Sequence, residues 1–406
     1  GWYILHGIVP GAHRRGASPL RFALGARLAT VLLSLGFGLQ RALIDGESLA
    51  ADRFLLATLA TMGVALIAAD GISSRERLDD LGKRMTYGAA FVALVAFFQF
   101  IVNVDLTRAM ELPGLDFNAA QYAIQTRGDF NRVAGTASHA IEFAVVIGMM
   151  LPIAAHYAIH ARTRNEAQFR WAILALIATG VPFSVSRAGI VAFGIAMITL
   201  AMVWDGRRKL NALVAMFLGV CVMFATVPGL FGTIKNLFLF AGQDTSISAR
   251  TEDYSVVGAM IAERPWFGRG AGTWIVEGST QAGLSGTQQY FTLDNEILGT
   301  TVQTGYVGLT AVLILYITGF ALARDARHRA QDYETKHLAQ ALAAITTVSL
   351  ATTVTFDSFG FPMHSGLVYL GFGVSAALWR LERDKQRARD IGPVAVPDTR
   401  EPAGLS

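Results

Sequence analysis

The sequence predicts an all-α membrane protein that crosses the bilayer about ten times. Hydrophobic residues make up 53% of the 406 residues and charged residues only 16%, whereas soluble domains carry roughly 25% charge. The mean hydropathy is high, at +0.43. The apolar residues fall into segments of about the 20 residues that a helix needs to cross the hydrocarbon core. We place these spans at 20–39, 49–69, 84–104, 138–160, 169–184, 188–204, 210–229, 297–321, 337–356 and 363–380.

The stretch 169–204 is predicted to hold two spans rather than one. As a single helix its 36 residues would extend about 54 Å, whereas the hydrocarbon core is about 30 Å thick. Pro182 and the polar residues that follow it are typical of a turn.

The distribution of Lys and Arg predicts the orientation of the spans. If both ends lie in the cytoplasm, 22 of the 34 Lys and Arg residues fall on inner segments and 10 on outer segments. Arg27 in the first span and Arg400 in the tail are the other two. The sequence therefore predicts ten spans with both ends inside. Residues 1–19 form an interfacial segment or the remnant of a span, and 381–406 form a cytoplasmic tail.

Two of the predicted outer segments are long, which is typical of functional loops. They are 105–137 and 230–296. The second contains an amphipathic pattern over 247–263, which predicts a helix that lies on the membrane. The glycines of 268–273 lack the Lys and the preceding strand of a phosphate loop, so we interpret them as a turn. The predicted organisation is spans 1–7 within 20–229, a large extracytoplasmic loop over 230–296, and spans 8–10 within 297–380.

Polar residues from distant parts of the chain flank the spans on the predicted outer face. Guanidinium groups match the oxygens of phosphate, and a carboxylate can take a proton from an attacking hydroxyl. Arginines at a lipid boundary therefore suit a pyrophosphate on a lipid carrier, and the set suits transfer of a glycan from it. The residues are Arg132, His139, Arg187, Arg250, Asp294, Asn295, Glu296, Asp357 and His364.

Each of these residues also has a simpler interpretation. Arg187 could reach to lipid headgroups, and Arg250 could be a solvated charge or a contact to anionic lipid. Asp294 could cap the eighth span, which would not exclude catalysis. His139 could be a satisfied histidine at a helix interface. Glu142 enters a span and needs a partner, such as Arg132 or His139.

The sequence predicts neither a metal site nor a cofactor. It contains no HExxH, CxxC or carboxylate cluster with metal-ligand spacing. Its one cysteine, Cys221, lies in an apolar segment and excludes an intrachain disulfide. Lys and Arg on the outer segments are too sparse for nucleic-acid binding.

Five segments resemble the O-antigen ligase/polymerase family of bacterial membrane glycosyltransferases. "NRVAGTASHAIEFA" resembles an Arg-x-x-Gly-Thr-x-x-His entry to a span, and "SVSRAGIVAF" resembles a Ser-Arg-[SG] turn. "ARTEDYSVVGAMIAERPWFGRGAGTW" resembles an Arg-led helix followed by a Pro-hydrophobic-Phe-Gly-x-Gly motif. "LDNEILGTTVQTGYVGLTAV" and, more weakly, "FGFPMHSGLVYLGFG" complete the set. Together they cover 131–375 in the expected order.

The resemblance implies a helical fold in the bacterial inner (cytoplasmic) membrane, with its active site on the extracytoplasmic face under a large loop. It implies a polyprenyl-pyrophosphate-linked glycan donor, a glycan or lipid-linked acceptor, and metal-independent, inverting transfer. Arg187 and Arg250 fall where the family places its two pyrophosphate-binding arginines, and Asp294 falls where it places the catalytic base. We expect the remaining residues to bind substrate: Arg132, His139, Asn295, Glu296 and His364.

The chain departs from the family pattern at one position. Ligases of the family have His where this chain has Asp294, so "DN" stands in place of "HN". An Asp can act as a base, especially where burial raises its pKa. The change favours a polymerase, which extends lipid-linked repeat units. The alternatives are a ligase that moves finished glycan to a lipid or protein, and a transporter of lipid-linked glycan.

Overall fold

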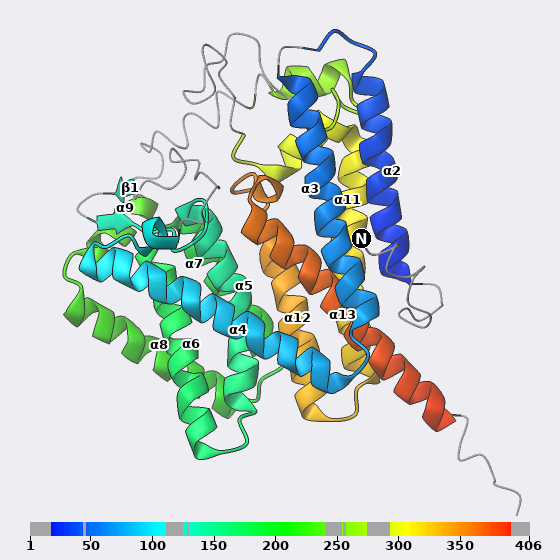
Figure 1. Ribbon diagram of the computed structural model, residues 1–406. Coiled ribbons are helices and arrows are strands. Elements are labelled where there is room, and N and C mark those ends of the chain that lie inside the picture. Colours follow the sequence, from blue (N-terminus) through cyan, green and yellow to red (C-terminus); the bar gives the residue numbers. More distant parts are fainter. Residues whose placement is uncertain are drawn as a thin grey trace, which may run out of the picture.

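The structure, a computed structural model, describes residues 18–43, 46–110, 125–127, 130–239, 254, 257–273 and 293–390. Within these ranges it is helical except for one short hairpin and the connections (Figure 1). The predicted amphipathic helix is described only in part, with residues 257–263 helical. The N-terminal segment before residue 18 and the tail after residue 390 lie outside the described residues.

Ten helices occupy the ten predicted apolar segments. The predicted division of 169–204 is confirmed, because one helix ends at Phe183 and the next begins at Arg187. The helices are α2 (Pro19–Gly38), α3 (Glu47–Gly71), α4 (Arg75–Phe97), α5 (Ala140–Ile159), α6 (Arg164–Phe183), α7 (Arg187–Ala201), α8 (Gly206–Thr226), α11 (Glu296–Arg329), α12 (Tyr333–Thr352) and α13 (Pro362–Asp390). The last helix runs ten residues into the predicted tail.

Length and hydropathy identify six of these helices as able to cross a membrane. They are α2, α3, α4 with its π-helical continuation Phe98–Val102, α5, α8 and α11. Helix α7 is apolar but has only 15 residues. The chain is therefore an all-α, multi-pass membrane protein, while the count of ten spans and their orientation stay predictions.

Side-chain caps fix where several helices begin. The side chains of Ser74, Thr163 and Asp332 accept hydrogen bonds from backbone N–H groups in the first turns of α4, α6 and α12. Such caps satisfy N–H groups that have no partner inside the helix and stabilise a helix by about 1 kcal/mol each.

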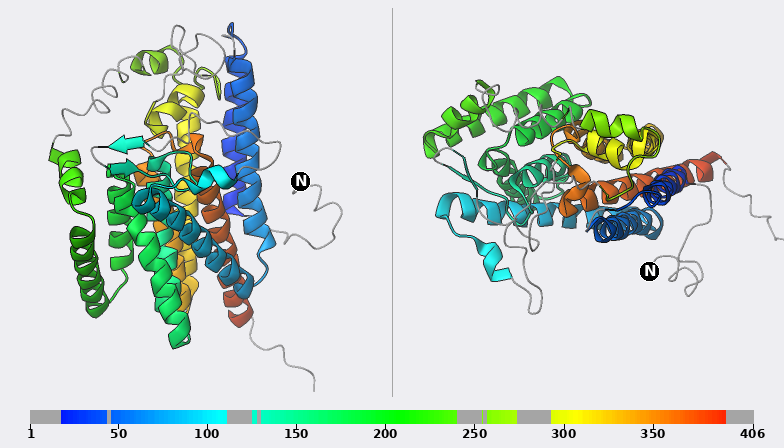
Figure 2. Two further views of the ribbon diagram at one scale, coloured as in Figure 1. Left: turned by 60° about the vertical axis from the view of Figure 1, so that its left-hand side comes forward. Right: turned by 90° about the horizontal axis from the view of Figure 1, so that it is seen from above.

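The helices form two groups that α12 joins (Figure 1). Helices α2, α3, α11 and α13 pack together, and α4, α5, α6 and α7 form the second group. Helix α5 lies at the centre, since 94% of its most apolar stretch is buried. Helix α8 stands at the side of the bundle (Figure 2), and none of its residues is buried by the described part of the chain.

Short elements lie beyond the helix ends. A 3-10 helix, η2 (Leu106–Met110), follows α4 and its π-helical turn, η1. The hairpin β1 (Gln125–Arg127) and β2 (Phe130–Arg132) pairs Gln125 with Arg132 in antiparallel register. Helix α9 (Leu230–Leu239) follows α8, and the 3-10 helix η4 (Ser358–Gly360) lies between α12 and α13. Helix η2 and the hairpin lie in the long outer segment predicted at 105–137, and α9 lies in the one predicted at 230–296.

Candidate functional site

Helices α5 and α7 approach each other closely, which places Arg187 beside the start of α5. A Cβ on Gly189 would lie 2.7 Å from the Cβ of Ala144, and a Cβ on Gly148 would lie 2.7 Å from that of Ala192. The two glycines therefore allow a backbone distance that larger residues would prevent, as small residues do in membrane helix packing. Because Arg187 begins α7, it lies at the same end of the bundle as the first turn of α5.

The turn before Arg187 is strained. Val185 has φ of 45°, a left-handed conformation that is a genuine outlier for a β-branched residue. Its side chain is fully buried and packs in one apolar cluster with Leu230, Phe100 and Phe130. Ser186 precedes α7 but its side chain makes no capping hydrogen bond within the described residues. Such strain persists only where surrounding packing holds it, and it is common at functional sites.

The segment between β2 and α5 is fixed to the end of α4. Gln99, in the π-helical turn, donates from its amide to the carbonyl of Gly135 (3.0 Å) and accepts from the N–H of Gly135 (2.8 Å). Gly135 has φ of 60°, and a Cβ there would lie 2.7 Å from the carbonyl oxygen of Val92. Asn131 donates to the side chain of Asn103 (2.8 Å). These contacts hold the segment that carries Arg132 and His139.

His139 is the N-cap of α5 and lies in the electrostatic field of two other predicted site residues. Its Nδ1 accepts from the N–H of Ile141 (3.2 Å), so its Nε2 carries the proton of the neutral ring. Burial and the nearby charge of Arg132 lower the pKa of His139 to about 4, and Asp294 acts in the opposite direction. At neutral pH His139 is therefore uncharged and can donate a hydrogen bond through Nε2.

Glu142 has partners that the sequence did not suggest. Its buried carboxylate accepts from three backbone N–H groups, those of Ser138 (2.8 Å), Met363 (2.8 Å) and His364 (3.1 Å). The prediction that Arg132 or His139 would pair with it is not borne out by these hydrogen bonds. The contacts instead join the start of α5 to the start of α13, where the free N–H groups of a helix favour a negative charge.

Asp294 lies one residue before the cap of α11. The side chain of Asn295, and not that of Asp294, accepts from the N–H of Leu298 (3.2 Å) and caps the helix. The alternative interpretation of Asp294 as the cap is therefore wrong. Asp294 is half-buried and acts electrostatically on both His139 and Asp357. A role of Asp294 as the catalytic base stays a prediction.

Glu296 joins α11 to the turn between α12 and α13. Its buried carboxylate accepts from the hydroxyl of Thr300 (2.6 Å) and the N–H of Phe359 (2.8 Å). Its backbone N–H donates to the carbonyl of Thr353 (2.8 Å). Its carboxyl group also hydrogen-bonds to that of Asp357, whose pKa burial raises. Substrate binding by Glu296 stays a prediction, while these contacts show it holding the start of α11 in place.

His364 is fully buried in α13. Its Nδ1 donates to the carbonyl of Ser358 (2.9 Å), so its Nε2 is the acceptor for the hydroxyl of Ser349 (3.1 Å). Ser349 in turn contacts the hydroxyl of Tyr316 (2.9 Å). Both ring nitrogens have partners in this arrangement, and a role of His364 in substrate binding stays a prediction.

Helix α11 is broken where a loop segment docks against it. Gly305 has φ of 68° and ψ of −174°, a region that essentially only glycine adopts. The loop replaces the missing helical partners, since Tyr306 donates to the carbonyl of Pro265 (2.8 Å) and Val307 to that of Trp266 (3.2 Å). The N–H of Arg269 donates to the carbonyl of Val302 (2.9 Å). We call residues 264–273 the docked segment. Its glycine turns at 268, 270 and 272, all with positive φ, confirm the turn predicted there.

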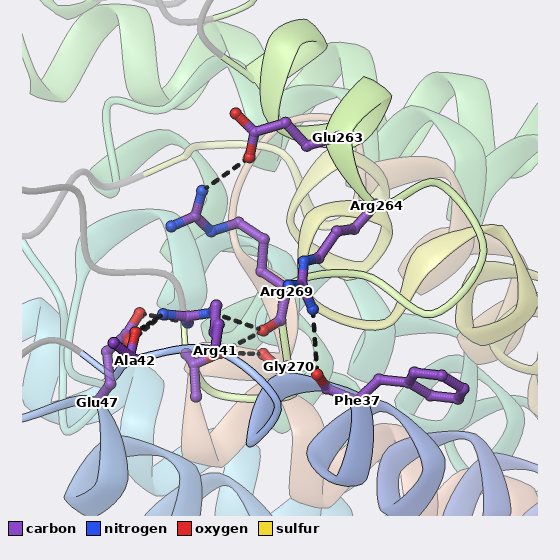
Figure 3. A network of polar contacts seen from close by, with 9 residues as sticks. Phe37, Arg41, Ala42, Glu47, Glu263, Arg264, Arg269 and Gly270 are labelled. Carbon is purple, nitrogen blue, oxygen red and sulfur yellow. Dashed lines mark hydrogen bonds and ion pairs between the residues drawn. The ribbon is translucent and has the colours of Figure 1, made fainter.

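The end of α2, the connection that follows it and the start of α3 secure the docked segment (Figure 3). Arg41 donates to the carbonyl of Arg269 (3.2 Å) and forms a two-pronged ion pair with the fully buried carboxylate of Glu47 (2.7 and 2.8 Å). Arg264 donates to the carbonyl of Phe37 (3.1 Å). Bidentate pairs of this kind fix geometry as well as adding binding energy.

The structure brings some predicted site residues together and leaves others undescribed. Arg132, His139 and Asp294 share one electrostatic neighbourhood, and Arg187 begins the helix packed beside them. Arg250 lies outside the described residues. Two positioning residues were not predicted from the sequence. Gln99 holds Gly135, and the side-chain oxygen of Gln303 accepts from the N–H of Gly272 (2.9 Å) in the docked segment. Both are polar residues inside apolar segments, a pattern that indicates a hydrogen-bond partner within the protein.

Comparison with known proteins bears on the middle of the chain. Residues 172–313 match the family model described as O-antigen ligase. The match begins within α6, includes the turn at Arg187, the docked segment and Asp294, and ends in α11. No curated protein matches the chain. The resemblance seen in the sequence is therefore confirmed, and the chain carries the domain of the O-antigen ligase/polymerase family of membrane enzymes over these residues.

Proposed function

We propose that the protein is a glycan polymerase that transfers polyprenyl-pyrophosphate-linked repeat units to an acceptor sugar hydroxyl at the outer leaflet of the bacterial inner membrane. The observation that carries the proposal is the meeting of Arg132, His139 and Asp294 beside the start of α7, which Arg187 begins. Cations and a neutral hydrogen-bond donor suit the binding of a pyrophosphate, and a carboxylate suits the removal of a proton from the acceptor hydroxyl.

Arg187 holds the pyrophosphate together with the start of α7. The side chain of Ser186 does not cap this helix within the described residues, and helix N-termini attract phosphate through their N–H groups and dipole. The positive charge of Arg187 also lies at the positive end of the helix dipole. A bound anion would offset the repulsion between the two. The resemblance assigns the second cation to Arg250, in the loop that leads to the docked segment.

Asp294 acts as the base in an inverting displacement. The acceptor hydroxyl attacks the anomeric carbon, its oxygen forms the new glycosidic bond, and its proton passes to Asp294. The bond from that carbon to the pyrophosphate breaks, and the pyrophosphate leaves with the electron pair. Charge builds up on the leaving group, and the arginines stabilise it there.

Arg132 and His139 complete the pocket. Because His139 stays neutral and its Nδ1 is occupied, its Nε2–H can donate to a phosphate or sugar oxygen without repelling the neighbouring Arg132. Permanently charged guanidinium groups supply the stabilisation that a metal ion would give in other enzymes, so we expect transfer to proceed in the presence of EDTA.

A ligase is the second candidate function. The matching family model is described as O-antigen ligase, and the same cations and base could pass a finished glycan to a lipid or protein acceptor. Asp294 in place of the ligase histidine favours the polymerase. The products distinguish the two, since a polymerase forms a ladder of chain lengths and a ligase forms one conjugate.

The test uses purified protein in nanodiscs with EDTA and lipid-pyrophosphate-linked oligosaccharide as both donor and acceptor. We expect a ladder from the unchanged protein and its loss in Arg187→Ala. Arg164→Ala is the matched control, because Arg164 begins α6 as Arg187 begins α7 but is exposed. An intact ladder in Arg187→Ala would refute the assignment of Arg187. Transport of the lipid-linked glycan with no bond formation would favour a transporter.

A further inference from the structure

Three histidines meet at the end of α5 that lies opposite the candidate site. His156 and His160 are four residues apart and lie on one face at the end of α5, and His337 comes from the first turns of α12. A ligating nitrogen from each lies within 4.8 Å of the others. About 20 residues of helix, roughly 30 Å, separate this cluster from His139. The cluster is therefore a second feature, independent of the glycan site.

We propose that His156, His160 and His337 form a binding site for one zinc ion. The distances between the ring centres are 4.7, 5.3 and 5.1 Å. An imidazole nitrogen binds zinc at about 2.0–2.1 Å, so three rings around one tetrahedral ion have centres about 5.2 Å apart. The cluster already has this triangular spacing.

The hydrogen bonds of the cluster leave nitrogens available as ligands. Nε2 of His156 and Nε2 of His160 are buried and have no hydrogen-bond partner among the described residues. Nδ1 of His160 donates to the carbonyl of His156 (2.9 Å), which leaves its Nε2 with a free lone pair. A backbone carbonyl commonly orients a metal-binding histidine in this way.

Trp204 competes with the metal for His337. The indole N–H can only donate, and it lies 2.8 Å from Nε2 of His337. In the metal-free protein the proton of His337 is therefore on Nδ1, which donates to Nδ1 of His156 (3.1 Å). Neutral His156 then has its proton on Nε2, and the nitrogen that it offers to zinc is Nδ1. For neutral His337 to bind zinc through Nδ1, its proton must move to Nε2, and the hydrogen bond from Trp204 is then lost.

The surroundings of the cluster select the kind of ion. Arg75, Arg170, Arg208 and Arg327 act electrostatically on its histidines. They weaken the binding of any cation. The bond between a neutral imidazole nitrogen and zinc is partly covalent, so it can form in spite of these charges. Calcium is a hard ion that prefers oxygen ligands, so it should not bind. Bound zinc would hold the end of α5 to the start of α12.

The test measures zinc bound to the purified full chain, with any purification tag removed, by equilibrium dialysis and elemental analysis. We expect one zinc per chain, no calcium, and a zinc-dependent rise in melting temperature. His160→Ala, at a partly exposed position, should lose both effects. His328→Ala is the matched control, because His328 is an exposed histidine at the end of α11.

A second variant keeps the test decisive. Trp204→Phe removes the competing donor and should bind zinc about tenfold more tightly, which corresponds to the loss of one hydrogen bond. Zinc retained by His160→Ala would overturn the proposal. Absence of zinc from both the unchanged protein and Trp204→Phe would overturn it too. Neither result would bear on glycan transfer at the opposite end.

Discussion

Replacing Gly305 by Ala should release the docked segment from α11. A Cβ at Gly305 would lie 2.2 Å from the carbonyl carbon and oxygen of Trp266, so the loop and the new methyl group cannot both keep their places. The backbone of Gly305 also lies in a region where a non-glycine residue is strained by about 1–3 kcal/mol. Both effects favour a straight α11 with the loop displaced.

The size of the effect follows from what the docked state loses. Four backbone hydrogen bonds join the docked segment to α11: those from Arg269, Gly270, Tyr306 and Val307. Each contributes about 0.5–1.5 kcal/mol net, but a straight helix re-forms a similar number. The strain of about 1–3 kcal/mol then dominates, which shifts the equilibrium towards the undocked loop about 5- to 150-fold.

Hydrogen exchange measured on protein in nanodiscs tests this directly. The amides of Arg269 and Gly270 should exchange faster in Gly305→Ala by the same factor, and glycan transfer should fall while the protein stays monodisperse. Gly299→Ala is the control, because it lies on the same helix and its nearest neighbour is 3.9 Å away. Unchanged exchange over 264–273 in Gly305→Ala would refute the docking argument.

Three further predictions concern the candidate site. Glu142→Ala leaves three backbone N–H groups without their acceptor, so it should lower the free energy of unfolding by about 3–5 kcal/mol; an unchanged midpoint in denaturant titration would contradict this. His139 has a pKa of about 4 when folded and 6.5 when unfolded. The unfolded chain therefore binds its proton first, and stability falls as the pH drops from about 6.5 to 4, by roughly 3 kcal/mol in total. His139→Gln should flatten part of the pH dependence of the melting temperature, and identical profiles would speak against it. Arg187→Lys keeps the charge but loses the planar fork, so it should retain phosphate binding and lose about tenfold or more in transfer rate; full transfer activity would show that the fork is not needed.

The sequence predicts the helices well because a membrane span is a local property. Apolar composition over 20 residues located the ten long helices of the bundle, and Pro182 with its polar neighbours located the turn before Arg187. The helix α13 continues to Asp390 because the charged residues of 381–390 are good helix formers, whereas hydropathy alone ends the span earlier. The break in α11 was missed because Gly305 lies in an apolar segment and its unusual conformation depends on a distant loop.

The sequence predicted which residues come close together better than it predicted their hydrogen-bond partners. The positions of Arg132, His139 and Asp294 relative to one another follow from spans that begin on the same face. Two of the three partners of Glu142 could not be predicted, because they are backbone N–H groups more than 220 residues away. The sequence offered Asp294 as the cap of α11, whereas its neighbour Asn295 caps the helix; both residue types favour this position, so composition alone does not separate them.

The exposed surface of α8 affects how the protein should be handled. With none of its residues buried by the described part of the chain, this helix takes its tilt and depth from the surrounding lipid. Bilayer thickness therefore acts on α8 more directly than on α5, which the protein itself encloses. A detergent micelle replaces that support by a mobile and curved one, so α8 should be the first helix to change position on extraction. Reconstitution into bilayers of matched thickness would restore the lipid support of α8, which the rest of the described chain does not supply.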